Sequence, residues 1–281
     1  MKGCLYIVAT PIGNLADLSQ RALEVLRSVA LVAAEDTRHS ARLLQAYGIT
    51  TPMLALHEHN EAQRGALLCE RIESGERIAL ISDAGTPLIS DPGYTLVREA
   101  HRRALAVVPV PGACAAVAAL SAAGLPSDRF CFEGFLPAKS PARRQRLGEL
   151  AAETRTLIFY EAPHRIEECL ADLVAVWGEA RPATLARELT KTFETIIQDS
   201  LGGLLQRVRT DPDQRKGEFV LVVQGGAERP VTSEEAAMDT LRVLLDYLPL
   251  KEAASAAARL TDLRKNRLYE LGLQLQNRAE A

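Results

Sequence analysis

Glycine-rich segments with polar side chains follow three apolar runs of the chain. The runs, at residues 5–9, 77–82 and 106–110, have the length and composition of buried strands. The segments after them cover residues 10–14, 83–93 and 111–115. Glycine lets a backbone approach a ligand closely, and parallel sheets bind ligands beyond the carboxyl ends of their strands. An ordinary tight turn is the alternative for any single segment, but three together predict a ligand site. None has the spacing of a GxGxxG or Walker loop.

Acidic and basic side chains follow two later apolar runs, at residues 156–160 and 183–187. If both runs are strands, their ends reach the same cleft, where a positioned base or cation assists reaction at a hydroxyl group. Surface pairing of Glu188 and Glu194 with Arg187 or Lys191 is the alternative. The candidates for chemistry are His164, Arg165, Glu188, Lys191 and Glu194.

Cationic side chains surround the start of a predicted helix, for which Ser140 is the expected N-cap and Pro141 the first helical position. Helix starts favour acids, because the positive end of the helix dipole lies there. Four cations at such a position predict a phosphate site, with a solvated basic face as the alternative. These cations are Lys139, Arg143, Arg144 and Arg146, and a second, weaker patch lies at residues 264–267.

The histidines and cysteines form no recognisable metal-binding pattern. His57 and His59 alternate without a nearby cysteine or a third ligand at fixed spacing, so loop residues beside a substrate are the better interpretation. The five cysteines form no CxxC pair and are odd in number. They predict reduced core thiols of a cytosolic protein and no metal.

The composition is that of an ordinary globular protein with more than one domain. The chain has 281 residues, of which 47% are hydrophobic and 25% charged, and a net charge of −3. Such a charge excludes a broadly cationic coat, so any binding of nucleic acid must come from local patches. Residues 104–127 carry no charge, but Pro109, Pro111 and Gly112 favour a strand, a turn and a buried helix over a membrane span.

Strand and helix patterns alternate up to residue 123, which predicts a parallel sheet covered on both faces. A helix is expected to begin at a capping box over residues 17–20. Residues 127–139 are expected to be irregular and to hold a domain boundary. Strands at residues 156–160, 183–187, 194–198 and 219–224, with helices at 165–176 and 201–209, then predict a second α/β unit with a mixed sheet. Three helical patterns follow, at residues 232–247, 251–260 and 266–276, the first with Thr232 and Glu235 at capping-box spacing.

Long segments of the chain resemble a known family. They read "LYIVATPIGNLADLSQRALEVL", "AAEDTRHSARLL", "LISDAGTPLISDPGYTLV", "PVPGACAAVAALSAAGLP", "FYEAPHRI" and "ARELTKTFE", in this order. The family is that of the small-subunit ribosomal RNA cytidine 2′-O-methyltransferases, in the tetrapyrrole methylase (class III methyltransferase) superfamily. The likeness covers essentially the whole chain, including the tail "LPLKEAASAAARLTDLRKNRLYELGL", which is similar to the helix-turn-helix-like module of this family.

The resemblance implies an α/β fold of two tetrapyrrole-methylase-type domains with a cleft between them, followed by a small three-helix module. The expected boundaries are residues 1–124, 125–228 and 229–281. It also implies a cytoplasmic homodimer that binds S-adenosylmethionine, methylates 16S rRNA of the small ribosomal subunit and uses neither a metal nor a membrane. Carried over, the donor-binding residues are Pro11, Asp83, Ala84, Gly85, Thr86, Cys114, Ala115, Tyr160 and Ala186. Many superfamily members have serine where this chain has Cys114, so the donor contact there is expected through the backbone.

Methyl transfer to a ribose hydroxyl is an in-line displacement, so alignment can supply most of the catalysis. A base or cation near the hydroxyl would assist, and Glu188, Lys191 and His164 are the expected catalytic candidates. Lys139, Arg143, Arg144, Arg146 and Arg165 are the expected RNA-binding residues. Two alternatives remain: a methyltransferase acting on a tetrapyrrole or another small molecule, and a DNA-binding regulator that uses the helical tail. The basic helix start disfavours the first, and the glycine-rich segments disfavour the second.

Overall fold

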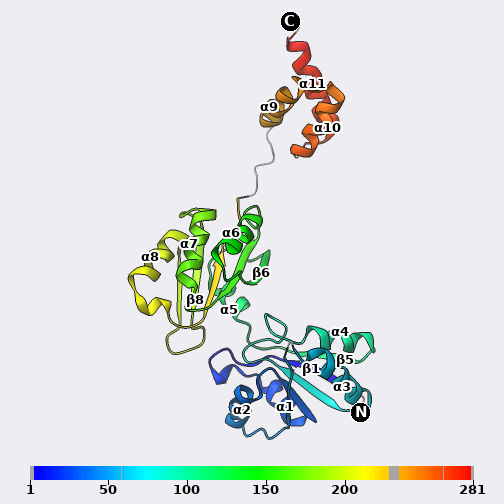
Figure 1. Ribbon diagram of the computed structural model, residues 1–281, viewed down its shortest axis with the longest axis vertical. Coiled ribbons are helices and arrows are strands. Elements are labelled where there is room, and N and C mark those ends of the chain that lie inside the picture. Colours follow the sequence, from blue (N-terminus) through cyan, green and yellow to red (C-terminus); the bar gives the residue numbers. More distant parts are fainter. Residues whose placement is uncertain (1–2, 58, 228–233, 262, 280–281) are drawn as a thin grey trace. The chain divides into compact units, whose positions relative to one another are not determined.

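The computed structural model describes residues 3–57, 59–227, 234–261 and 263–279 (Figure 1). The chain forms two compact units, Met1–Gly225 and Gly226–Ala281. The longer unit contains two five-stranded sheets, and the shorter one contains helices. The α/β class and the helical tail are therefore as expected. The expected division into three domains, with boundaries after residues 124 and 228, remains a proposal.

The first sheet is entirely parallel, with strand order β3-β2-β4-β1-β5. The strand β1 lies between β4 and β5, with Cys4 opposite both Arg77 and Ala106. All residues of β2 are buried, as expected for a strand covered on both faces. The strands are β1 (Cys4–Val8), β2 (Leu31–Ala34), β3 (Met53–Ala55), β4 (Arg77–Ile81) and β5 (Ala106–Val110).

Helices cover the two faces of this sheet because alternate strand residues point to opposite sides. Ala79 and Ile81 pack with α1 and α2, whereas Ile78 and Leu80 pack with α3 and α4. Ser19 caps α1 by accepting a hydrogen bond from Ala22 N at 3.1 Å. The expected capping box at residues 17–20 was therefore misplaced. The helical elements are η1 (Leu15–Asp17), α1 (Gln20–Ser28), α2 (Thr37–Ala46), α3 (Glu61–Glu73), α4 (Tyr94–Arg102) and α5 (Ala115–Ala122).

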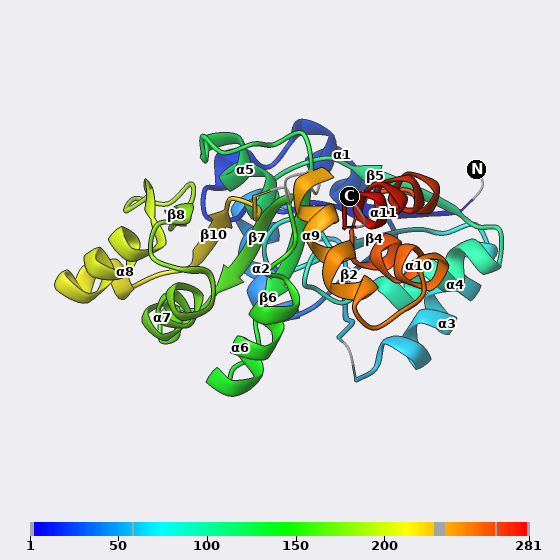
Figure 2. The same ribbon diagram turned by 90° about the horizontal axis from the view of Figure 1, so that it is seen from above.

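The second sheet has the order β6-β7-β10-β8-β9 and is mixed, as expected. Only β6 and β7 pair in parallel, and the other neighbours are antiparallel. Helices α6, α7 and α8 lie with it (Figure 2). The elements are β6 (Phe130–Phe135), α6 (Ser140–Glu149), β7 (Thr156–Glu161), α7 (Ile166–Trp177), β8 (Pro182–Arg187), β9 (Thr195–Ser200), α8 (Leu201–Thr210), η2 (Pro212–Arg215) and β10 (Phe219–Val223).

Helix α5 belongs by sequence to the first sheet but packs against the second. Its residues Ala116, Ala119 and Leu120 share an apolar cluster with Ile158 of β7 and Val220 of β10. The uncharged stretch at residues 104–127 thus contains β5, a turn and α5. In the described part of the chain, no helix is both long enough and apolar enough to cross a membrane.

Two strands, β3 and β6, were not predicted from the sequence. Residues 127–139 were expected to be irregular but contain β6, which is interrupted by a register shift between Phe132 and Gly134. Gly134, at this register shift, has a positive φ of 64°, which glycine tolerates. The strand β3 has three residues, too few for a periodic pattern.

The shorter unit consists of α9 (Glu234–Leu245), α10 (Leu250–Leu260) and α11 (Lys265–Ala279). Small and apolar residues from all three helices bury one another, among them Leu241, Ala254 and Leu268. This unit therefore has its own core. Of the capping box expected at its start, Thr232 lies outside the described residues.

Candidate functional site

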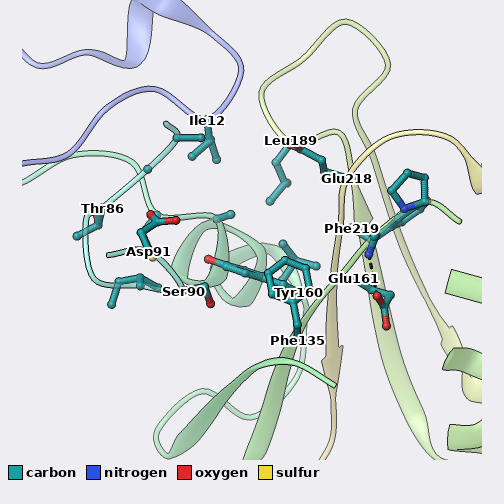
Figure 3. A pocket seen from close by; sticks show the side chains of 18 residues that line it. Ile12, Thr86, Ser90, Asp91, Phe135, Tyr160, Glu161, Leu189, Glu218 and Phe219 are labelled. Atoms are coloured by element: carbon teal, nitrogen blue, oxygen red, sulfur yellow. Dashed lines mark hydrogen bonds between the residues drawn. The ribbon is translucent and has the colours of Figure 1, made fainter. Parts of the chain in front are cut away.

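A pocket of about 380 Å³ lies where loops of the first sheet meet the second sheet (Figure 3). One side comes from the segments after β1, β4 and β5. The other comes from β6, β7 and β10, the segments next to β7 and β10, and the loop after β8. The volume suits a small-molecule ligand. The lining residues are Ile12, Ala84, Gly85, Thr86, Ile89, Ser90, Asp91, Cys114, Ala115, Phe135, Tyr160, Glu161, Ala162, Pro163, Leu189, Glu218, Phe219 and Val220.

Backbone hydrogen bonds join the loops that follow β1 and β4. Thr10 N donates to Gly85 O at 2.8 Å, and Gly85 N donates to Thr10 O at 3.1 Å. Gly85 has a φ of 84°, and a Cβ on it would lie 3.2 Å from Cγ2 of Ile12. The left-handed backbone and the close neighbour both explain glycine at this position.

Tyr160 connects β7 to the first turn of α5. Its hydroxyl accepts a hydrogen bond from Ala116 N at 3.1 Å, which satisfies one of the N–H groups that a helix start leaves free. Phe132 and Phe135 make edge-to-face contacts with its ring, at centroid distances of 4.9 and 5.7 Å. Burial, followed by the neighbouring Cys114, raises the pKa of Tyr160, so the phenol is neutral at physiological pH.

Six of the nine residues expected to bind a donor line this pocket: Ala84, Gly85, Thr86, Cys114, Ala115 and Tyr160. The other three lie beside it. Asp83 points to α2, because its Oδ1 accepts a hydrogen bond from Asp36 N at 3.1 Å. Pro11 is buried in the β1 loop, and Ala186 packs in the cluster with α5.

Asp91 is a carboxylate in the pocket that the sequence analysis did not single out. Burial, with a smaller contribution from repulsion by Asp83, raises its pKa to about 6, although a Ser82 hydrogen bond opposes the shift. Two non-glycine residues just before it, Leu88 and Ser90, have left-handed φ values of 74° and 67°. Such conformations are costly and concentrate at functional sites. The segment "SDPG" was visible in the sequence, but the direction of its side chains was not.

Glu188 and Lys191, two of the expected catalytic residues, form an ion cluster at the edge of the pocket. Lys191 Nζ lies 2.8 Å from Glu188 Oε1 and 2.9 Å from Glu218 Oε2. Burial alone would raise the pKa of Glu188, but hydrogen bonds from Lys191 and from Glu218 N outweigh it and hold that pKa below its usual value. The same partners overcome burial and raise the pKa of Lys191. Neither group is thus free to accept a proton, and of the three only Glu218 lines the pocket.

His164, the third expected catalytic residue, lines a separate hollow of about 730 Å³. Pro163 lines both this hollow and the main pocket, so the two adjoin. Arg215 and Lys216 share the hollow with Glu167 and Glu168. His164 therefore lies outside the main pocket, in a hollow that adjoins it.

Most of the cations expected to bind RNA form ion pairs with acidic side chains of the protein itself. Arg143 is fully buried, and its Nε lies 2.7 Å from Asp172 Oδ2, while Arg144 Nε lies 2.5 Å from Asp172 Oδ1. The assignment of Arg143 to an exposed phosphate site was wrong, because Asp172 compensates the charge inside the fold. Lys139, and not Ser140, is the N-cap of α6, and the Ser140 hydroxyl donates to Asp172 at 2.9 Å.

The remaining cations differ in whether an acidic side chain pairs with them. Arg146 pairs with Glu133 and Glu149 at 2.7 and 3.0 Å and stays partly exposed. Arg165 pairs with Glu161 at 3.1 Å. Among the described residues, no ion pair involves Lys139, which is exposed. In the shorter unit, Arg267 pairs with Glu234 and Glu270, which weakens the patch expected at residues 264–267.

Among the described residues, no group of three or more histidines, cysteines or acids is placed to hold a metal ion. His57 and His59 lie with their ring centroids 6.0 Å apart, and Glu58 between them lies outside the described residues. All five cysteines are free thiols, with Cys4, Cys69 and Cys169 buried.

The sequence and the fold are those of a methylase. Residues 4–205 match the family described as tetrapyrrole (corrin/porphyrin) methylases, and residues 231–276 match the RsmI C-terminal HTH domain. Solved structures show the same fold at low identity. The uroporphyrin-III-C-methyltransferase of Thermus thermophilus has a TM-score of 0.55 at 19% identity, covering 80% of this chain and 94% of that one. A diphthine synthase has a TM-score of 0.59 at 17% identity, covering 79% and 90%.

Curated relatives of higher sequence identity narrow the class of methylase to which the chain belongs. The ribosomal RNA small subunit methyltransferase I of Pseudomonas aeruginosa is 59% identical over 99% of this chain and 99% of its own length. The protein of the same name from Escherichia coli O157:H7 is 56% identical, covering 98% and 96%, and that from Synechocystis is 47% identical, covering 98% and 99%. The chain belongs to the ribosomal RNA small subunit methyltransferase I family of the tetrapyrrole methylases. It is therefore an enzyme, which excludes the regulator interpretation.

The pairing of Arg143 with Asp172 gives a prediction on stability. Asp172→Ala leaves a buried guanidinium without its partner, so the free energy of unfolding should fall by roughly 3–5 kcal/mol. The exposed Glu168, 3.6 Å from the same guanidinium, is the matched control, and Glu168→Ala should change stability by less than about 1 kcal/mol. Urea denaturation of both variants measures the difference.

The same pair has a defined pH dependence. Burial would raise the pKa of Asp172, but Arg144, Arg143 and Ser140 outweigh it and lower that pKa. The stabilisation is therefore complete above the unfolded pKa of about 3.9 and is lost as the pH falls through the folded value. Asp172→Ala should flatten the fall in stability below about pH 4. An unchanged acid profile would show that Asp172 is not ionised in the fold.

Proposed function

We propose that this protein transfers a methyl group from S-adenosylmethionine to the ribose 2′-hydroxyl of a cytidine in 16S rRNA of the small ribosomal subunit. The observation that carries the proposal is the pocket between the two sheets, in a chain more than half identical to proteins named ribosomal RNA small subunit methyltransferase I. The cytidine and the 2′-oxygen come from the resemblance of the motifs. The proposal includes a cytoplasmic location and a homodimer.

The residues of the pocket fit the donor by their chemistry. Ile12, Leu189, Phe219 and Val220 provide apolar walls for a nucleoside. Ala115 is the first residue of α5, where backbone N–H groups have no intrahelical acceptor and are available to a polar ligand. Gly85 keeps the β4 loop close enough for its backbone to make contacts. When bound, S-adenosylmethionine supplies an electrophilic methyl group.

The protein's own contribution would be alignment and exclusion of water. Gly13 lies against the loop after β8, where a Cβ on it would be 2.9 Å from Thr190 Oγ1 and 3.1 Å from Leu189 O. This contact closes one wall of the pocket over Leu189. Tyr160 fixes the start of α5 on the opposite side. Holding a hydroxyl in line with the methyl group accounts for a large part of the expected rate enhancement.

Features beside the pocket support a polynucleotide substrate. Phe135 lines the pocket, is exposed and offers an aromatic face on which a base can stack. The adjoining hollow with His164, Arg215 and Lys216 can receive neighbouring nucleotides. Lys139 and the partly exposed Arg144 and Arg146 remain our proposed phosphate contacts. A small-molecule substrate, as in the uroporphyrin enzyme with this fold, would leave these features unused.

Labelled methyl transfer tests the proposal. Purified protein, tritiated S-adenosylmethionine and small subunits from a strain that lacks the corresponding gene should yield labelled 16S rRNA. Alkaline hydrolysis should then leave the label in a dinucleotide, because a 2′-O-methyl group blocks cleavage of the next bond. Label on a base, or transfer only to a tetrapyrrole added in parallel, would contradict the proposal.

The donor assignment predicts the effect of a single methyl group at Gly85. Gly85→Ala must adopt a left-handed φ, at a cost of about 1–2 kcal/mol, and its Cβ presses on Ile12. If the loop shifts to relieve this strain, donor affinity measured by calorimetry should fall by about tenfold. Gly48→Ala is the matched control, because Gly48 has a φ of 64° and nothing within 4 Å of its Cβ position. It should lose similar stability and keep donor affinity.

The proposed phosphate contacts predict a salt effect at Lys139. Lys139→Glu should weaken RNA binding at every sequence, lower the slope of log affinity against log salt by about 1, and spare donor affinity. Arg102→Glu, on α4 with its side chain 70% exposed, controls for the change in net charge. Equal effects of both substitutions would show that only overall charge matters.

A further inference from the structure

The structure assigns a positioning role to Arg165: we propose that its guanidinium, together with that of Arg143, fixes residues 136–138 and thereby presents the Phe135 ring to a base of the RNA. This inference rests on the proposed function and concerns how its RNA substrate is recognised. The alternative for Arg165 is the direct phosphate contact that was expected from the sequence. Substitution by lysine separates the two roles, because lysine keeps the charge and loses the planar group.

Three successive carbonyl groups in the loop between β6 and α6 accept hydrogen bonds from the two arginines. Arg165 Nη2 donates to Leu136 O at 2.5 Å. Arg143 Nη1 donates to Ala138 O at 3.1 Å and to Pro137 O at 3.4 Å. A buried carbonyl needs a donor, and these arginines supply one where the chain leaves the sheet. The bonds therefore fix the main chain between the end of β6 and the start of α6.

Each guanidinium is itself held by a buried carboxylate. Arg143 Nε lies 2.7 Å from Asp172 Oδ2, and Arg165 Nε lies 3.1 Å from Glu161 Oε1. The side chains of Asp172 and Glu161 are only 4% and 1% exposed. A guanidinium can serve a carboxylate with one nitrogen and a carbonyl with another, because its donors form a rigid planar fork. Both cations are thus engaged inside the fold, which leaves little of their charge for a phosphate.

Phe135 is the residue through which this support reaches the pocket. It is the last residue of β6, lies opposite Tyr160 in the sheet, and has its ring 5.7 Å from that of Tyr160. The ring lines the pocket and is 54% exposed, whereas the next residue, Leu136, is buried in the core. Leu136 is also the residue whose carbonyl Arg165 holds. Fixing Leu136 therefore fixes the direction of the exposed ring.

Arg165 acts from the buried face of the strands. Neighbouring residues of a strand point to opposite sides, and in Figure 3 the Glu161 carboxylate points away from the Tyr160 hydroxyl. Arg165, the partner of this carboxylate, lines neither the pocket nor the adjoining hollow that contains His164. It is therefore placed to orient a residue that touches the RNA rather than to touch the RNA itself.

Steady-state methylation of small subunits by the full chain tests the assignment. Arg165→Lys keeps a cation for Glu161 but loses the fork that also holds Leu136 O. It should raise KM for the subunits roughly 3–10-fold, part of the effect of losing a stacked base, while kcat and donor affinity by calorimetry stay within about twofold. A phosphate contact would survive this substitution, so an unchanged KM would overturn the inference. A fall in donor affinity that accounts for the lost activity would overturn it too.

A double-mutant cycle with Phe135 tests the route of the effect. Phe135→Ala removes an exposed ring and should raise KM for the subunits roughly 5–150-fold, the range expected for one stacked base. Adding Arg165→Lys to this variant should raise KM no further, because the ring that Arg165 orients is gone. The same fold-change in both backgrounds would show that Arg165 acts on another part of the protein, contrary to the proposal.

Arg181→Lys is the matched control for a loss of rigidity. Arg181 Nε donates to Gln224 O at 2.7 Å, and its guanidinium lies 4.3 Å from the centre of the Trp177 ring. This arginine also holds a main-chain carbonyl, but at the opposite end of the second sheet, so its substitution should lower stability in urea and leave KM unchanged. An equal rise in KM would overturn the inference. If the wild-type protein places no methyl group on the ribose of 16S rRNA, the proposed function itself fails before any variant is compared.

Discussion

Two backbone hydrogen bonds between Thr10 and Gly85 hold together the loops that follow β1 and β4. They bring Ile12 against the left-handed turn at Gly85, which forms one wall of the pocket. The next residue, Gly13, then reaches the loop after β8 and ties the first sheet to the second. Because these bonds use main-chain atoms, they hold the two loops together without engaging the side chains that line the pocket.

Helix α5 is the second connection between the sheets. It leaves β5 of the first sheet and buries its small residues against β7 and β10 of the second. The hydroxyl of Tyr160 completes its first turn. A ligand bound beside Cys114 and Ala115 therefore contacts a helix whose orientation is set by the second sheet, while the neighbouring loop at Gly85 is set by the first. The geometry of such a site therefore depends on how both sheets are packed.

Local pattern was enough to predict most strands and the three glycine-rich segments, because these depend on residues close in sequence. It failed where a distant partner decides the outcome. The burial of Arg143 depends on Asp172, 29 residues away on another helix. The pairing of Glu188 with Lys191 is local and was the alternative given from the sequence, but the second partner of Lys191, Glu218, lies 27 residues away and was not foreseen. Asp83 and Asp91 both lay in a segment predicted to bind a ligand, but only Asp83 was given a role, because local pattern does not show which of the two carboxylates faces the pocket.

The place of β1 in the first sheet bears on how the chain folds during synthesis. Its two neighbours, β4 and β5, are made only after residues 77–81 and 106–110 have been translated. Until then the first apolar segment of the nascent chain has no strand to pair with, and its unpaired edge is open to wrong associations. Closing the sheet requires contacts across about a hundred residues, which slows folding. The segment that later helps to form the pocket is thus made first, but it has both of its neighbouring strands only after residue 110 has been added.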